Sequence, residues 1–174
     1  MLLKHSDFII RDAVDTDAQT LCAWWNDGDI MAHAGFPKGL NTSPEHIRAE
    51  LKGDSDESGR RLIIEKEGRP IGEMNYKNKG NNIAEIGIKI CDFSIQNNGS
   101  GKVLLSMLIR TLFSCGYHTI TLDTNLDNTR AQHVYERLGF RKIRVNIDSW
   151  TDQLGKKQSS VDYELTEHNF ISFV

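Results

Sequence analysis

The chain has 174 residues, of which 39% are hydrophobic and 26% are charged, so it can bury one substantial core. We expect a single domain over residues 1–174. The net charge of -3 at pH 7 argues against a protein that binds nucleic acid through a general basic field. The start of the chain lacks the apolar core of a signal peptide, and no stretch approaches the length of a membrane span. We therefore expect a cytoplasmic protein.

The cysteines and histidines do not follow a metal-binding or disulfide pattern. Cys22, Cys91 and Cys115 lie far apart in otherwise apolar or strand-like stretches, which is typical of reduced thiols in a cytosolic protein. The six histidines are scattered, and neither C-x-x-C nor H-E-x-x-H spacing occurs. We expect three free thiols and no bound metal.

The N-terminal half alternates strands and helices. A strand is predicted at residues 8–11, and residues 16–19 form a capping-box pattern for a helix that ends near Asn26. Residues 27–42 contain three glycines and a proline, which predicts a long irregular loop, and Ser43 then caps a second helix. An antiparallel meander is predicted from three strands at residues 61–67, 70–77 and 83–91.

The C-terminal half adds two helices and three strands. Residues 103–113 are apolar nearly all round, which is typical of a helix buried against a sheet. A strand at residues 118–124 follows it, and the order strand, helix, strand implies a parallel crossover. The second helix runs from Asn128 to Leu138, and two final strands are predicted at residues 140–147 and 161–165. We therefore expect an α/β protein with a mixed, mostly antiparallel sheet of about seven strands and flanking helices.

A glycine-bearing loop, Gln96-Asn97-Asn98-Gly99-Ser100-Gly101-Lys102, stands between the meander and the buried helix. Glycine lets the backbone approach a ligand, and the unpaired N–H groups of a first helical turn attract an anion, so the loop suits a phosphate. A Walker loop fits poorly, because Gln96 stands at its first glycine and Val103 replaces its hydroxyl residue. A dinucleotide fingerprint also fits poorly, because Leu104 stands at its third glycine. A plain glycine turn remains the alternative.

Two segments carry a family resemblance. The pattern Gln-x-x-Gly-x-Gly at residues 96–101 resembles the acetyl-CoA pyrophosphate loop of the GNAT superfamily of N-acetyltransferases. The segment Asn128 to Phe140 closely resembles that family's N-x-x-[AS]-x-x-x-[YL]-x-[KR]-x-G-F segment. The N-terminal Ile10-Arg11, Asp17-Ala18 and Trp25-Asn26-Asp27 are similar to the subgroup that contains ribosomal-protein N-terminal acetyltransferases. The resemblance covers essentially the whole chain and implies the GNAT fold.

The resemblance implies acetyl-CoA as the donor co-substrate and gives it a binding site. Backbone N–H groups of residues 98–102 would hold the pyrophosphate, the strand at residues 88–93 would pair with the pantetheine arm, and Asn128 would hydrogen-bond the cofactor. Lys102 either adds charge to this site or is an ordinary solvated lysine. The implied cofactor-binding residues are Ile90, Cys91, Phe93, Gln96, Asn97, Asn98, Gly99, Ser100, Gly101, Lys102, Asn128 and Tyr135.

The resemblance also implies direct attack of an amine on the thioester, with Tyr135 as the general acid for the departing thiolate. A phenol with a pKa of about 10 stays protonated at neutral pH, as an acid requires, although periodicity alone makes Tyr135 a core aromatic. Glu85 and Asp123 each match a position of the general base in some branches of the family, and either is alternatively a solvent-facing strand residue. Neither Cys91 nor Cys115 belongs to a recognisable constellation with histidine, so we expect no covalent intermediate.

The resemblance also implies an acceptor site between residues 27–42 and 146–160. The rim residues would be Trp24, Trp25, Trp150, Asp27, Asp29, Asp148 and Asp152. An acidic, aromatic rim suits a cationic amine, whereas the bland alternative places Trp25 in the core and the aspartates in turns.

The expected function is an N-acetyltransferase that acts on a small-molecule amine or a peptide N-terminus, with neither nucleic acid nor a membrane as partner. A homodimer is also possible. Two alternatives remain. The first is an acetyl-CoA-binding sensor or regulatory module without acetylation activity. The second is an aminoglycoside- or polyamine-type acetyltransferase of the same fold.

Overall fold

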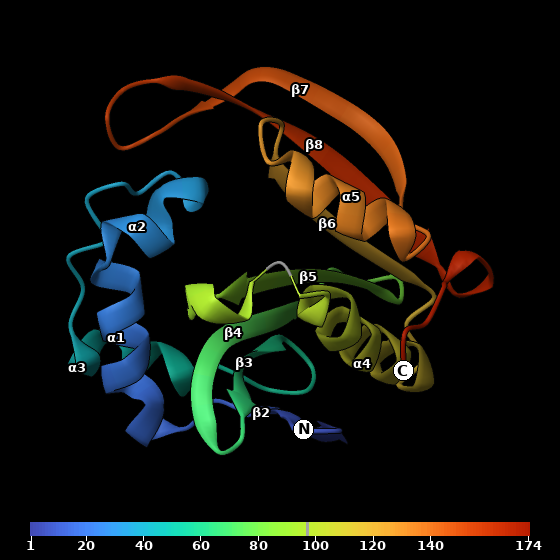
Figure 1. Ribbon diagram of the computed structural model, residues 1–174, viewed down its shortest axis with the longest axis horizontal. Coiled ribbons are helices and arrows are strands. Elements are labelled where there is room, and N and C mark those ends of the chain that lie inside the picture. Colours follow the sequence, from blue (N-terminus) through green and yellow to red (C-terminus); the bar gives the residue numbers. More distant parts are fainter. Residues whose placement is uncertain (97) are drawn as a thin grey trace.

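An eight-stranded sheet runs through the computed structural model, which describes residues 1–96 and 98–174 (Figure 1). In chain order the strands are β1 (Leu2–His5), β2 (Phe8–Asp12), β3 (Gly59–Lys66), β4 (Arg69–Asn78), β5 (Ile83–Ile90), β6 (Thr119–Asn125), β7 (Arg141–Thr151) and β8 (Lys157–Thr166). In space they follow the order β1-β2-β3-β4-β5-β6-β8-β7. The sequence predicted about seven strands; it missed β1, which has four residues and little burial to produce a pattern.

The helices are α1 (Ala18–Asn26), α2 (Gly28–Met31), α3 (Pro44–Leu51), α4 (Ser100–Ser114) and α5 (Thr129–Arg137), with short 3-10 turns at Asp15–Asp17, Ala32–Ala34, Phe93–Ile95 and Glu167–Asn169. The predicted cap of α3 is confirmed, because the Ser43 hydroxyl accepts the backbone N–H of His46 at 3.2 Å. The segment predicted to be irregular, residues 27–42, instead contains α2 and a 3-10 turn. Within the described residues, no helix combines the length and the apolar character needed to cross a membrane.

The start of α1 differs from the predicted capping box. The carboxylate of Asp17 accepts the backbone N–H of Val14 at 2.8 Å and forms an ion pair with Arg11 at 2.7 Å. Asp17 therefore organises the turn before α1, in place of the hydroxyl of Thr16. The pairing also ties that turn to β2, because Arg11 lies on this strand.

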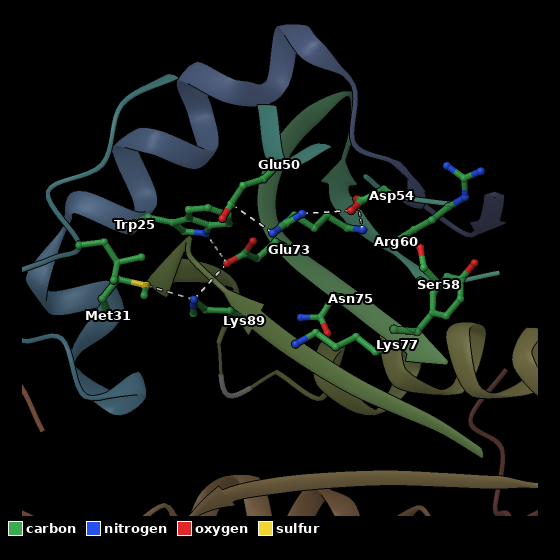
Figure 2. A pocket seen from close by; sticks show the side chains of 14 residues that line it. Trp25, Met31, Glu50, Asp54, Ser58, Arg60, Glu73, Asn75, Lys77 and Lys89 are labelled. Atoms are coloured by element: carbon green, nitrogen blue, oxygen red, sulfur yellow. Dashed lines mark hydrogen bonds and ion pairs between the residues drawn. The ribbon is translucent and has the colours of Figure 1, made fainter. Parts of the chain in front are cut away.

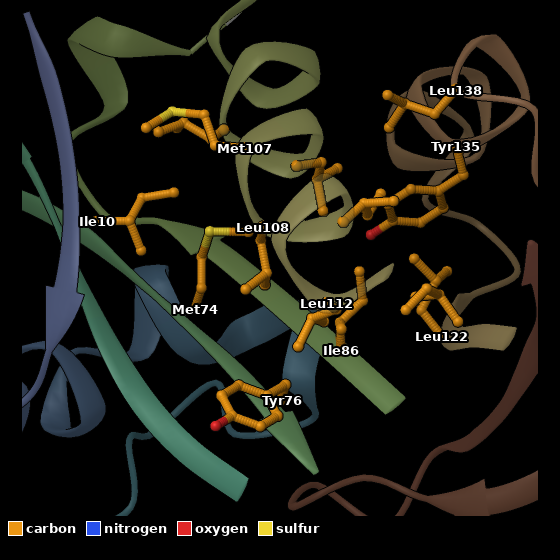
Figure 3. Close-up of a cluster of buried hydrophobic side chains, with 14 of the residues drawn as sticks. Ile10, Met74, Tyr76, Ile86, Met107, Leu108, Leu112, Leu122, Tyr135 and Leu138 are labelled. Carbon is orange, nitrogen blue, oxygen red and sulfur yellow. The ribbon is translucent and has the colours of Figure 1, made fainter. Parts of the chain in front are cut away.

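Two hydrophobic clusters lie on opposite faces of the sheet. On β3, Leu62 and Ile64 belong to the larger cluster with α4, whereas Ile63 between them joins the smaller cluster with α1 and α3. Alternate residues of a strand point to opposite faces, so α4 and α1 cover opposite sides of the sheet. Figure 3 shows part of the larger cluster, in which Leu108 of α4 is fully buried. Burial of one such leucine contributes about 2 kcal/mol to folding.

Strands β5 and β6 pair in parallel over a short stretch. The paired residues are Ile83–Glu85 on β5 and Thr119–Thr121 on β6, which confirms the predicted parallel crossover. Beyond Glu85, β5 continues to pair with β4, and β6 continues to pair with β8. The two strands therefore part, and a slot opens in the middle of the sheet.

Candidate active site

A cleft of about 910 Å³ lies where β5 and β6 part. Its walls come from β5, the start of α4, β6 and α5, and further residues come from α2, the 3-10 turn after it, β7 and β8. The residues of the sequence-based site that line the cleft are Ile90, Phe93, Gln96, Gly99, Gly101, Lys102, Asp123, Asn128 and Tyr135. The fold thus brings the glycine loop and the segment from Asn128 onward to one place.

Among the described residues of the expected site, four do not line the cleft: Glu85, Cys91, Asn98 and Ser100. Cys91 is 7% exposed, and its backbone N–H donates to the carbonyl of Ile71 at 2.8 Å. Ser100 is also buried, and its hydroxyl bonds the side chain of Asn98. Glu85 forms an ion pair with Lys79 at 3.3 Å instead. Asn97, another expected cofactor ligand, lies outside the described residues.

The glycine loop leaves open space in front of the first turn of α4. Gly99 has φ of +86°, a left-handed conformation that favours glycine, and a Cβ at Gly99 or Gly101 would have no neighbour within 4 Å. The side-chain amide of Gln96 donates to the carbonyl of Ile90 at 2.9 Å and so fastens the loop to the end of β5. Because glycine has no side chain, neither Gly99 nor Gly101 would obstruct an anion that binds in front of the loop.

Lys102 lines the cleft at the first turn of α4. Its ammonium lies 4.6 Å from the centre of the Phe173 ring, a cation–π contact with the C-terminal segment. Asn128 lies across the cleft at the start of α5. Its side-chain carbonyl accepts the backbone N–H of Ala131 at 3.2 Å, so it caps the helix while it faces the cleft.

Tyr135 combines a core position with access to the cleft. Its side chain is 7% exposed, and its ring packs edge-on against Phe140 and Tyr163, with ring centres 5.9 and 5.7 Å apart. Figure 3 shows it with Leu122 and Leu138 in the larger cluster. Burial, with a contribution from the charge of Asp123, raises the pKa of Tyr135 to about 12. The phenol therefore keeps its proton at neutral pH.

Asp123 lies on β6 beyond the point at which the strands part. The residue is exposed and lines the cleft, and desolvation by the groups around it raises the pKa of its carboxylate. The charges of Asp162, directly opposite on β8, and of Glu85 raise it further. A carboxylate of raised pKa is a better proton acceptor than an ordinary aspartate.

The part of the cleft that α2, the 3-10 turn after it and β7 line, here called the acceptor half, matches the expected rim in part. Asp29 and Trp150 line the cleft, together with His33, which the sequence did not single out. Asp27 caps α2, because its carboxylate accepts the backbone N–H of Asp29 at 2.8 Å. Asp152 caps the hairpin turn, because it accepts the backbone N–H groups of Leu154 and Lys156, each at 2.9 Å. Both aspartates thus follow the alternative in which they serve turns.

The remaining rim residues lie away from this cleft. Trp24 and Trp25 pack against the smaller hydrophobic cluster. Asp148 is exposed, with a left-handed φ of +48°, and its backbone N–H donates to the hydroxyl of Ser159 at 2.9 Å. The cleft therefore takes its aromatic character on the acceptor side from Trp150.

A second hollow of about 540 Å³ lies beside the cleft, and Lys89 lines both (Figure 2). There the buried carboxylate of Glu73 accepts the indole N–H of Trp25 at 2.8 Å and the ammonium of Lys89 at 3.0 Å. The same ammonium lies 3.1 Å from the sulfur of Met31. Sequence reasoning missed this cluster. Its signal was the opposite charges of Glu73 and Lys89, which face each other across β4 and β5.

Two further cleft residues were missed on α5. Arg130 and His133 both line the cleft, three residues apart on one helix face. Only their position beside the apolar stripe of α5 could have indicated them. Over residues 1–96 and 98–174, no group of three or more His, Cys, Asp or Glu side chains is arranged to hold a metal ion.

Comparison with known proteins finds relatives of this chain by sequence and by structure. A family model described as an acetyltransferase (GNAT) domain matches residues 7–141. A mycothiol acetyltransferase from Arthrobacter sp. (strain FB24) is 28% identical over 161 residues, covering 84% of this chain and 50% of that protein. An uncharacterised protein from Methanocaldococcus jannaschii is 26% identical over 142 residues, covering 81% of this chain and 29% of that protein. The chain thus spans half or less of the length of these relatives.

Solved structures share the fold at low sequence identity. A spermidine N-acetyltransferase from Vibrio cholerae, crystallised with CoA and spermine, superposes with a TM-score of 0.84 at 20% identity, covering 95% of this chain and 98% of that one. A ribosomal-protein-alanine N-acetyltransferase from Brucella melitensis superposes with a TM-score of 0.77 at 17% identity, covering 90% and 98%. With the family model matched over most of its length, the chain belongs to the GNAT acetyltransferase family.

Proposed function

We propose that this protein is a single-domain N-acetyltransferase, residues 1–174, that moves the acetyl group of acetyl-CoA to a primary amine by direct attack. The observation that carries the proposal is the convergence of the glycine loop, Asp123 and Tyr135 on one cleft where the sheet opens. We place the reaction in the cytoplasm, where free thiols such as Cys22, Cys91 and Cys115 stay reduced.

The donor half of the cleft suits the pyrophosphate and the thioester arm of acetyl-CoA. The open space over Gly99 and Gly101 and the N-terminus of α4 favour a phosphate group, and Lys102 adds a positive charge. Residues 86–90 of β5 have lost β6 as a neighbour, so their backbone groups on that side are available to an extended ligand. The CoA in the Vibrio cholerae spermidine acetyltransferase supports this assignment. Acetyl-CoA itself supplies the activated acyl group.

Tyr135 acts as the general acid. A leaving thiolate needs a proton, and the phenol carries one because its pKa is raised to about 12. Its edge-on contacts with Phe140 and Tyr163 restrict the ring to one orientation.

Asp123, rather than Glu85, acts as the general base, directly or through water. Asp123 opens on the cleft, whereas Glu85 pairs with Lys79 and does not reach it. An alkylammonium must lose a proton before it attacks, and the raised pKa of Asp123 brings it closer to the working pH than an ordinary carboxylate.

The acceptor is a primary amine on a small molecule or at a peptide N-terminus. Asp29 and Asp123 give the acceptor half two carboxylates that attract a protonated amine. Similar proteins are named as acetyltransferases of mycothiol, spermidine and ribosomal-protein alanine, and these names support an amine acceptor of this kind.

The test is release of free thiol from acetyl-CoA in the presence of a panel of amines, with Tyr135→Phe as the diagnostic variant. We expect the variant to lose kcat by about 100-fold or more while its affinity for acetyl-CoA stays within about twofold. Unchanged turnover would remove Tyr135 from the mechanism. Acetyl-CoA binding without turnover on any amine would instead favour a sensor module.

A further inference from the structure

The tip of the β7–β8 hairpin is fastened to the loop between α2 and α3 by one side chain. The Oε1 of Gln153 accepts the backbone N–H of Lys38 at 2.7 Å, and its Nε2 donates to the carbonyl of Gly39 at 2.9 Å. The backbone N–H of Gln153 donates to the carbonyl of Gly35 at 2.9 Å. Both ends of the amide and the main chain thus hold one short segment, residues 35–39. We call this arrangement the Gln153 clasp.

Trp150 packs against the same segment. Gly35 has φ of +92°, and a Cβ there would lie 2.3 Å from Cζ3 of Trp150, so the indole ring lies directly on the glycine backbone. Trp150 lines the cleft from β7, and Ala34, next to Gly35, lines it from the helix side. The two walls of the acceptor half therefore meet, and the Gln153 clasp holds them together. Figure 1 shows the tip of the β7–β8 hairpin next to the region of α2.

The base of the α2–α3 loop is anchored independently of the hairpin. The side chain of Asn26 accepts the backbone N–H of Thr42 at 2.8 Å and donates to its carbonyl at 3.0 Å. The backbone N–H of Leu40 donates to the carbonyl of Trp25 at 2.8 Å. Removal of the Gln153 side chain therefore breaks two of the three hydrogen bonds described above between the hairpin and residues 35–39, and so loosens the tip of the loop while its base stays in place.

We infer that Gln153 is a specificity-determining residue. It keeps the tip of the β7–β8 hairpin joined to residues 35–39, and the two together form a closed bridge across the acceptor half of the cleft. This inference rests on the proposed N-acetyltransferase function and narrows its substrate class. A closed bridge admits an amine that enters end-on as a slender chain and excludes one with bulk next to its nitrogen. The acceptor is thus an unbranched alkyl primary amine, whose ammonium group Asp29 and Asp123 attract from the walls of the cleft.

The experiment compares n-hexylamine with cyclohexylamine, which have the same number of carbons and nearly the same basicity. For the wild type we expect kcat/KM to favour n-hexylamine by about tenfold or more, as a steric pocket wall can achieve. Gln153→Ala should reduce this ratio to below about threefold and leave the KM for acetyl-CoA unchanged. Leu154→Ala is the matched control, because Leu154 lies in the same turn with its side chain 60% exposed; it should behave as the wild type.

A purely structural role would lower activity on both amines equally, so the ratio is the deciding measurement. Trp150→Leu opens the same bridge without removal of a clasp hydrogen bond, and it should also lose the preference; it decides the question if Gln153→Ala unfolds. A wild-type preference that survives both variants would overturn the inference, as would wild-type activity on peptides without activity on n-hexylamine. Absence of turnover on every amine would overturn the proposed function as well.

Discussion

Asp123 and Tyr135 face the same cleft from a strand and a helix, and the charge on the aspartate contributes to the raised pKa of the tyrosine. One group is a carboxylate of raised pKa and the other a phenol that holds its proton, so the two can act as base and acid in one turnover. Their separate titrations make the pair testable by pH.

The first prediction concerns the pH profile. The wild-type kcat/KM should fall at acidic pH as Asp123 takes up a proton, and no alkaline loss should come from Tyr135 below a pH of about 12. Asp123→Asn should lower kcat/KM by about 100-fold and abolish the acidic limb. Glu85→Gln is the control and should keep the wild-type profile; the assignment fails if the two variants exchange these behaviours.

The same substitution has the opposite effect on stability. The pKa of Asp123 is raised in the folded protein above its ordinary value of 3.8, so the folded state binds the proton more tightly than the unfolded chain. Stability from this group is therefore lost as pH rises above 3.8. Asp123→Asn should raise the melting temperature at pH 7, and its advantage should vanish below the ordinary pKa. Melting curves at several pH values measure this, and an Asn variant less stable at pH 7 would contradict it.

The ion pair between the buried Glu73 and the partly exposed Lys89 should show strong coupling. Lys89→Met leaves the carboxylate of Glu73, 8% exposed, with the indole N–H of Trp25 as its remaining partner. Loss of one partner of a largely buried pair should cost about 3 kcal/mol in the free energy of unfolding. The double variant Glu73→Gln/Lys89→Met should lose less than the sum of the single variants in denaturant titrations. Additive losses would show that the pair is not coupled.

Two of the thiols, those of Cys91 and Cys115, should differ in reactivity. Burial, followed by the charge of Glu73, raises the pKa of Cys91 to about 12, so it carries almost no thiolate at neutral pH. Cys115 is exposed. Iodoacetamide at pH 8 should therefore label Cys115 in the native protein and Cys91 only after denaturation, as mass spectrometry of peptides would reveal. Rapid native labelling of Cys91 would refute its buried state.

Much of the architecture followed from local patterns. The meander and α4 carry strong periodicity, and the parallel pairing of β5 with β6 follows from the order strand, helix, strand. Strand β1 and helix α2 did not follow. The first has little buried surface to create alternation, and the second begins at Gly28, a poor helix former, on a cap from Asp27.

The site was harder to predict than the fold because sequence order does not say where two strands part. Glu85 lies opposite Thr121 in the last paired position, so it stays outside the slot, whereas Asp123 lies beyond that position and faces it. Cys91 and Ser100 lie in the expected segments with their side chains turned into the protein. The cluster of Trp25 and Glu73 depends on contacts between α1 and β4, elements far apart in the chain.

The short pairing of β5 with β6 divides the sheet into two mechanical units. Strands β1 to β5 form one hydrogen-bonded plate and β6, β8 and β7 form another, with residue pairs at Ile83–Glu85 as the hinge between them. We expect thermal motion to move these plates against each other about that hinge. An extended ligand that lies along residues 86–90 would connect the two plates, so amide hydrogen exchange should slow in both of them when such a ligand binds.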